Sequence, residues 1–156
     1  MSEETITVEF ERAVGLIEKT IRQLGVDPEA VKLDPPGGIG RGWSLMRGSA
    51  AVAVFLRNPR EGEDAPQLRV VAPIVKIDAA QEAALFRRLL ELNAQGMGPL
   101  AFGLLHDRVV VLAERRSTDL EPAEVEHLIQ RVGAVADHYD DQLIARFGGQ
   151  RVSDLS

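Results

Sequence analysis

The stretch WSLMRGSAAVAVFLRN, residues 43–58, contains two runs of β-prone residues on either side of the dipeptide Gly48-Ser49. Glycine tolerates a positive φ, which the first central position of a type II′ hairpin turn requires. Short β-prone runs separated by two such residues are typical of a β-hairpin. We therefore predict two antiparallel strands that meet at Gly48-Ser49.

Three more strands and a helix are predicted downstream of this hairpin. In QLRVVAPIVKI, residues 67–77, apolar residues alternate as in a strand, and Pro73 predicts an edge position or a bulge because proline cannot donate to a strand ladder. Residues 79–93 change to helical spacing. The stretch LAFGLLHDRVVVLAER, residues 100–115, predicts two strands around a tight turn.

A helix is predicted at each end of the chain. The first helix ends at Gly25, because glycine often terminates helices, and the last begins at Pro122 and runs to Gly148. The predicted order is α-β-β-β-α-β-β-α, which is an α+β fold. The apolar stripes that predict these helices are Phe10, Val14, Ile17, Ile21 and Leu24 in the first, and Val125, Ile129, Val132, Ala136, Tyr139, Leu143 and Phe147 in the last.

Length and composition are those of one globular domain. A chain of 156 residues with 45% hydrophobic and 27% charged residues can bury a sizeable core without a disulfide or a metal. We predict a single domain over residues 1–156, with its core at about 5–149 and a short loose C-terminal tail.

The net charge and the lack of cysteine limit which classes of partner and which cellular compartment we expect. The net charge of −6 repels a nucleic-acid backbone, and no basic stripe reverses it locally. No apolar run approaches the roughly 18 residues needed to cross a bilayer, and the N-terminus is acidic where a signal peptide is basic. Without cysteine there is no disulfide framework. We expect a cytoplasmic protein that binds neither nucleic acid nor a membrane.

The stretch VADHYDD, residues 135–141, gathers metal-ligand residue types in one place. Projection of the last helix at roughly 100° per residue puts His138 almost opposite to the apolar stripe, with Asp137 and Asp141 beside it and Asp140 closer to the buried edge. His127 is about 16 Å from His138 along a helix, so the two histidines cannot share an ion. We predict a solvated helix face and no metal site.

No other motif predicts catalysis or cofactor binding. GGIGRG, residues 37–42, follows a Pro-Pro loop and opens a strand, whereas a dinucleotide fingerprint follows a strand and opens a helix. Ser44, Ser49 and Ser117 have no histidine and acid companions nearby in the sequence, although distance in sequence leaves a triad open. We predict no catalytic residue and no cofactor-binding residue, and therefore no enzyme.

A resemblance to a known family rests on three pieces of the sequence. They are the Arg47-Gly48-Ser49-Ala50 turn, Leu92-Asn93 at the end of the middle helix, and the closing stretch from Ala136-Asp137 to Phe147-Gly148. With these pieces the chain resembles the YbjN family from about Phe10 to Gly149. That family is similar in fold to the class I chaperones of type III secretion. The resemblance implies a five-stranded antiparallel sheet packed with helices, usually a homodimer, and a regulatory or chaperone-like role without a defined substrate.

The middle helix has a wider apolar arc than packing on one sheet requires. Leu85, Leu89 and Leu92 form one stripe, and Phe86 and Leu90 form an adjoining one, so that the arc spans roughly 160° where about 100° suffices. The secretion chaperones that the chain resembles dimerise partly through this helix. We predict that Phe86 and Leu90 meet a second copy of the chain; the alternative is that strands and loops of the same chain cover them.

These observations favour a non-catalytic function in protein binding. We expect a homodimer that holds an unknown client protein against apolar sheet and helix surfaces. The alternative is a small-ligand sensor or an enzyme with a pocket between sheet and helices, which needs convergent polar groups that the sequence does not show. A nucleic-acid-binding regulator is opposed by the charge.

Overall fold

The structure is a computed structural model that describes residues 2–155. Its backbone contacts group into two compact units, each described by itself below. Unit 1 comprises the residues up to Leu45 together with 53–70 and 114–130, and unit 2 comprises 46–52, 71–113 and the residues from Arg131 onward. The single domain expected from the sequence stays a prediction.

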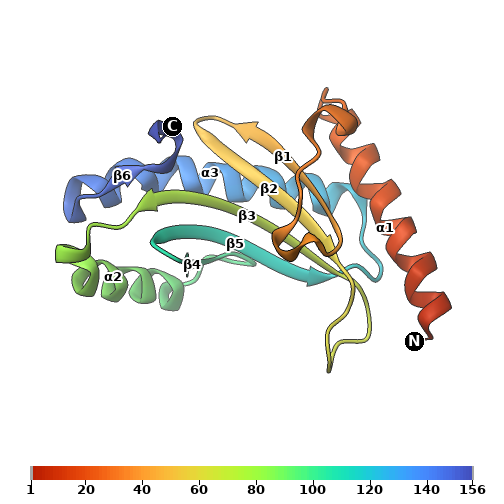
Figure 1. Cartoon of the computed structure of the whole chain (residues 1–156). Helices are drawn as coiled ribbons and strands as arrows, with labels where there is room; N and C mark the ends of the chain where they lie inside the picture. Colours follow the sequence, from red (N-terminus) through yellow and green to blue (C-terminus); the bar gives the residue numbers. More distant parts are fainter. Residues whose placement is uncertain (1, 156) are drawn as a thin grey trace. The chain divides into compact units, whose positions relative to one another are not determined.

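The predicted order of helices and strands is confirmed (Figure 1). One sheet has the strand order β1-β2-β3-β5-β4, and a short sixth strand, β6, pairs with β3. The predicted α+β fold with an antiparallel sheet is therefore confirmed, with one strand more than expected. The helices are α1 (Glu3–Gln23), α2 (Glu82–Gln95) and α3 (Pro122–Phe147), and the strands are β1 (Arg41–Arg47), β2 (Ala50–Arg57), β3 (Gln67–Lys76), β4 (Ala101–Leu105), β5 (Arg108–Arg116) and β6 (Gln150–Arg151).

The hairpin between β1 and β2 turns at Gly48-Ser49, as predicted. Gly48 has a φ of 60°, whereas Ser49 is not among the residues with positive φ, which fits the first central position of a type II′ turn. A Cβ on Gly48 would also lie 3.2 Å from the Asp137 Cγ of α3. The turn therefore depends on glycine for both its backbone conformation and its close neighbour.

We expect Gly48→Val to lower the free energy of unfolding by about 1–3 kcal/mol, because a β-branched side chain is strained at this φ. Chemical denaturation followed by circular dichroism measures the change. Gly62→Val shares the positive φ (84°) but its added Cβ would meet no atom within 4 Å, so a larger loss in Gly48→Val than in Gly62→Val measures the contact with Asp137. A Gly48 variant as stable as the wild type would show that the turn does not need glycine.

Helix α1 forms part of the core of unit 1. Ser2 caps its first turn by accepting a hydrogen bond from the Thr5 N–H (3.2 Å). The predicted stripe is largely confirmed, with Leu24 at the C-cap. The buried residues of α1 are Phe10, Ala13, Val14, Ile17, Thr20 and Ile21.

A polar cluster links α1 to the segment that follows β5 in unit 1. The Arg12 guanidinium donates to Glu9 (2.7 Å) and to the backbone oxygen of Ser117 (2.9 Å). Ser117 is fully buried, and its hydroxyl donates to Glu9 Oε1 (3.0 Å). The hydrogen bond from Arg12, followed by that from Ser117, holds the pKa of Glu9 below its usual range despite partial burial. The cluster satisfies a buried hydroxyl that the sequence alone left without a partner.

The loop between β2 and β3 is closed by an ion pair. Arg57 donates to both carboxylate oxygens of Glu63 (2.6 and 2.9 Å), and the backbone N–H of Arg60 donates to Glu63 Oε1 (2.8 Å). The Arg57 hydrogen bond, followed by the Arg60 N–H, lowers the pKa of Glu63 to about 2. The ionised carboxylate is thus the form that the folded loop holds.

Glu63→Gln is expected to flatten the pH dependence of the unfolding free energy in acid. The pKa of Glu63 is about 2 in the folded chain and 4.5 without these partners, so its contribution is complete above pH 4.5 and is lost as the pH falls toward 2. Urea denaturation at several pH values between these limits measures the slope. Glu61→Gln, at an exposed position in the same loop, is the control. Identical slopes for wild type and Glu63→Gln would contradict the assignment.

In unit 2, α2 packs against β4 (Figure 1). The predicted inner stripe is buried, with Leu85, Leu89 and Leu92 each at most 6% exposed. Asn93 fixes the position of α2 along β4, because its side-chain amide accepts from the Phe102 N–H (2.8 Å) and donates to the Phe102 oxygen (3.1 Å). The predicted helix over 79–93 begins as a 3-10 turn at Ala79–Gln81 before the α-helix proper.

The C-terminal tail is bound to the sheet, so the prediction of a loose tail is wrong. β6 pairs antiparallel with the end of β3, with Arg151 opposite Val75 and Gln150 opposite Lys76. A 3-10 turn, η4 (Val152–Asp154), follows.

Two glycines explain why the tail binds there. Gly148 and Gly149 have φ values of 73° and 94°, which turn the chain back after α3. A Cβ on Gly149 would lie 2.3 Å from the backbone oxygen of Lys76. Only glycine allows the tail to approach β3 this closely.

The predicted edge position of Pro73 is also wrong, because β3 lies between β2 and β5. Proline removes a donor wherever it stands, and that effect alone does not place a strand at an edge. β6 pairs with β3 only at Val75 and Lys76, beyond Pro73. Within residues 2–155, no helix is both long and apolar enough to cross a membrane.

Candidate functional site

The turn between β1 and β2 is tied to the second half of α3 in unit 2. The Ser49 hydroxyl lies 2.6 Å from Asp137 Oδ1 and 3.3 Å from Asp140 Oδ2, so its single hydrogen favours Asp137. The Ser49 hydroxyl, then its backbone N–H, hold the pKa of Asp137 below its usual range, with a smaller attraction from Arg151. Asp137 therefore anchors the turn although it is exposed.

Asp140 is the buried charge of this site, with 4% of its surface exposed. Arg151 Nε lies 3.2 Å from Asp140 Oδ2, and the same guanidinium contacts Asp141 and lies 3.8 Å from Asp154 Oδ2. Within the described residues Arg151 Nε has no aligned hydrogen-bond acceptor, so its attraction to Asp140 is that of an ion pair. A buried carboxylate is unfavourable without such a partner. We call Asp140, Asp141 and Ser49 the arginine seat.

A cavity of about 400 Å³ adjoins the arginine seat. Residues of β2, β3 and the tail form its walls, and most of them are small or apolar. Met46, which lines it, is 59% exposed. The lining residues are Met46, Ser49, Ala50, Ala51, Pro73, Ile74, Arg108, Asp140, Arg151, Val152, Ser153 and Leu155. An apolar space beside a buried charge and the end of β3, where the backbone already pairs with the tail, is suited to binding a peptide segment.

The solvated helix face predicted for residues 135–141 is found for only part of this stretch. His138 is exposed and makes its contacts along α3, with Gln142 (3.1 Å) and the Tyr139 ring. Asp140, in contrast, is buried against the tail. Within residues 2–155, no group of three or more acidic or histidine side chains has the geometry to hold a metal ion. The aspartates bind Ser49 and Arg151 instead.

Sequence reasoning missed Ser49 and Arg151 as partners of these aspartates. Ser49 does have acid companions, and Ser117 has Glu9, but neither serine has a hydrogen bond to histidine among the described residues. The burial of Asp140 was indicated by its position near the buried edge of the helical projection. No sequence signal pointed to Arg151, because it follows two glycines in a segment without periodicity.

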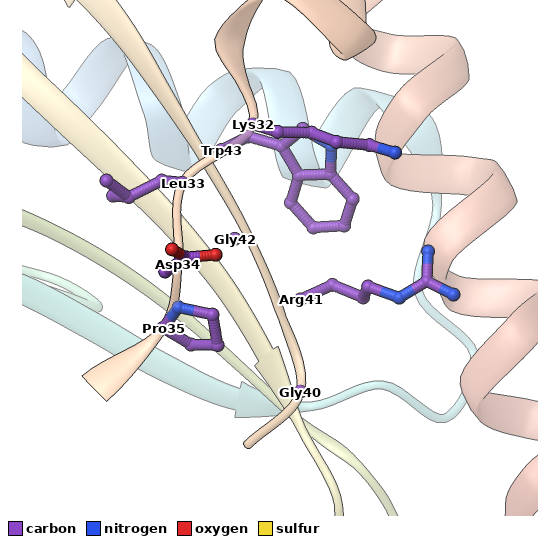
Figure 2. A pocket seen from close by; sticks show the side chains of 8 residues that line it. All are labelled: Lys32, Leu33, Asp34, Pro35, Gly40, Arg41, Gly42 and Trp43. Atoms are coloured by element: carbon purple, nitrogen blue, oxygen red, sulfur yellow. The ribbon is translucent and has the colours of Figure 1, made fainter. Parts of the chain in front are cut away.

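Unit 1 has a second cavity of about 290 Å³, beside the start of β1 (Figure 2). Residues 32–35 run next to β1, where the Leu33 N–H donates to the Gly42 oxygen (2.8 Å). Figure 2 shows Lys32 and Arg41 pointing toward α1, on the same side as the Trp43 ring. Arg41 lies 3.7 Å from Glu11 of α1 and Lys32 lies 2.8 Å from Glu29, so both cations are paired with carboxylates. The GGIGRG stretch leads past this cavity into β1.

The predicted interface residues lie on the exposed surface of α2. Leu90 is 67% exposed, the highest value among the large apolar side chains of residues 2–155, and Phe86 is half-buried. On neighbouring β4, Leu104 and Leu105 are 45% and 42% exposed. Whether Phe86 and Leu90 meet a second copy stays a prediction.

Solved structures place the fold among the type III secretion chaperones. One chain of the ExsC–ExsE complex superposes with a TM-score of 0.61 at 17% identity, covering 85% of this chain and 94% of that one. A chain of the HopA1–SchA chaperone–effector complex gives 0.56 at 12% identity, covering 85% and 94%. A chain of the ExoU–SpcU complex from Pseudomonas aeruginosa gives 0.54 at 13% identity, covering 80% and 95%. At these identities the likeness concerns the fold.

The sequence identifies the family more closely than the fold does. The family model described as T3SS (YopN, CesT) and YbjN peptide-binding chaperone 1 matches residues 12–155. The chain belongs to this family, which confirms the resemblance to the YbjN family and to the secretion chaperones. No curated protein matches the sequence.

Proposed function

We propose that this chain is a non-catalytic, chaperone-like or regulatory protein of the cytoplasm that binds a segment of a client protein and acts as a homodimer. The observation that carries the peptide-binding part is the family match over residues 12–155. The apolar cavity beside the arginine seat supports it, because such a cavity can receive side chains of an extended segment.

Binding of extended segments is tested on an array of immobilised peptides, each about 15 residues long, probed with the labelled full chain. We expect a subset of peptides to bind, to be competed by the same peptides in solution, and to remain unmodified. Hydrogen exchange with a bound peptide then locates the protected backbone amides. An array without any competed peptide would refute the proposal, and a peptide that is cleaved or modified would favour an enzyme.

The homodimer is proposed from the outer stripe of α2. Leu85, Leu89 and Leu92 already supply the buried face of this helix, whereas Leu90 is mostly exposed. An exposed leucine next to Phe86 fits a two-fold interface in which each residue meets its counterpart. Leu104 and Leu105 of β4, the strand that α2 contacts, are also exposed.

The double variant Phe86→Asp/Leu90→Asp is expected to be a folded monomer, because a dimer would have to bury the unpaired charges of both subunits. Light scattering measures the mass, and circular dichroism checks the fold. Ala84→Asp/Gln95→Asp adds the same two charges at exposed positions elsewhere on α2 and is expected to leave the dimer intact. A monomeric wild type, or a variant that stays dimeric, would remove the proposed interface.

A further inference from the structure

The tail of this chain is bound in the way that proteins bind extended peptides. Its backbone pairs with a strand at Val75 and Lys76, and one long side chain, Arg151, enters a polar seat. Backbone pairing supplies affinity in such complexes, and the seated side chain supplies specificity. The tail therefore displays the contacts that a separate peptide would make at this place.

The arginine seat selects for a guanidinium. Asp140 is buried and Asp141, which is exposed, contacts the same guanidinium, so two carboxylates share one cation. Arginine suits such a seat better than lysine because its planar fork contacts two carboxylates at once. Asp140 loses its cation if Arg151 leaves, so any peptide that displaces the tail has to supply an arginine in its place.

The tail is held lightly outside the seat. β6 has two residues, Val152 and Leu155 are half-buried, and Ser153 and Asp154 are exposed. A short covalent connection gives such a segment an effective concentration of about millimolar, so a weak intrinsic affinity is enough to keep it bound. The cavity beside Val152 and Leu155 leaves room for larger apolar side chains than the tail provides.

We propose that the end of β3 and the arginine seat form a binding site for extended peptides that carry an arginine, and that residues 150–155 occupy this site as a replaceable internal ligand. The proposal rests on the peptide-binding function proposed above and specifies its site and partner. The preferred client segment pairs with Val75 and Lys76, places its arginine against Asp140 and Asp141, and follows it with apolar residues that enter the cavity.

The test uses the full chain and a fluorescein-labelled peptide with the sequence GGQRVSDLS, which is that of residues 148–156. Gly149→Ala puts a Cβ 2.3 Å from the Lys76 oxygen, and it should release the tail without changing the seat. We expect fluorescence anisotropy to show at least tenfold tighter peptide binding to this variant than to the wild type. Arg151→Ala, a second full-chain variant, should bind the peptide at least as tightly as the Gly149→Ala variant does, because its own tail cannot fill the seat.

Two controls separate the seat from general effects of the substitutions. Gly96→Ala replaces another glycine of unit 2 with a positive φ (103°) but with nothing within 4 Å of the added atom, and it should bind the peptide no better than the wild type. The peptide carrying Arg151→Ala should bind the Gly149→Ala variant at least tenfold more weakly than the original peptide does. Circular dichroism of each variant confirms that it is folded.

Equal peptide binding by the wild type and both tail variants would overturn the proposal, as would equal binding of the two peptides. A Gly149→Ala variant that forms a larger oligomer and excludes the peptide would mean that the tail of a second copy takes the site, which also overturns it. The peptide array distinguishes these failures from failure of the proposed function. Array peptides that bind while the tail peptide does not would leave the function standing and place its site elsewhere.

Discussion

Trp43→Ala is expected to lower the free energy of unfolding by about 3–5 kcal/mol, the usual loss when a large aromatic side chain is truncated in a core. Trp43 is 1% exposed and is the only tryptophan of the chain. Figure 2 shows its ring on the side of β1 that faces α1. Truncation would leave a cavity between elements that unit 1 can close only by moving the backbone.

Trp43→Phe separates the effect of ring volume from that of the indole N–H. Nε1 is buried without a hydrogen-bond partner among the described residues, which costs free energy that phenylalanine does not incur. We therefore expect Trp43→Phe to be more stable than Trp43→Ala by at least about 2 kcal/mol. Urea denaturation followed by far-ultraviolet circular dichroism measures both, since the fluorescence probe is removed. A loss below about 1 kcal/mol for Trp43→Ala would mean that the ring is not part of a closed core.

The parts of the fold that the sequence predicts are those determined by neighbouring residues. The β1–β2 turn depends on the φ of one glycine, Gly48, so the dipeptide Gly48-Ser49 is enough to predict its position. The helices follow from the spacing of residues that share one face, as in the stripe from Val125 to Phe147 of α3. The outer residue Leu90 follows from the same projection, because an arc wider than one contact face leaves a stripe exposed.

The parts that the sequence does not predict depend on residues far apart in the chain. β6 has two residues and no periodicity, and it is placed by the close approach of Gly149 to Lys76. Asp140 lies at the border of the helical projection, where a helix alone does not decide between water and protein. Asp140 is buried because it contacts Arg151 of the tail and Ser49, which lies 91 residues earlier in the chain.

The same acidic stretch shows why residue types alone did not identify the site. Asp137 and Asp140 look alike in the sequence, yet one anchors an exposed turn and the other is buried beside an arginine. Their roles differ because α3 presents them to different neighbours, the hairpin turn and the tail. Several carboxylates close together in the sequence resemble a metal site. In the folded chain, however, the cation beside Asp140 is an arginine of the C-terminal tail.

Arg151→Met is expected to lower the free energy of unfolding by about 3 kcal/mol, at the lower end of the range for a buried pair that loses one partner. Methionine keeps much of the length of the side chain but leaves Asp140, which is 4% exposed, without its cation. The lower end applies because the Arg151 side chain is 28% exposed and part of its attraction is screened by water.

The second substitution Asp140→Asn tests whether the unpaired charge causes this loss. In the double variant Arg151→Met/Asp140→Asn no buried carboxylate remains, so we expect it to regain at least half of the stability lost in Arg151→Met. Urea denaturation of the wild type, both single variants and the double variant completes the cycle. Additive losses would show that Asp140 and Arg151 act independently, and the arginine seat would then be a contact at the surface rather than the site that binds the tail.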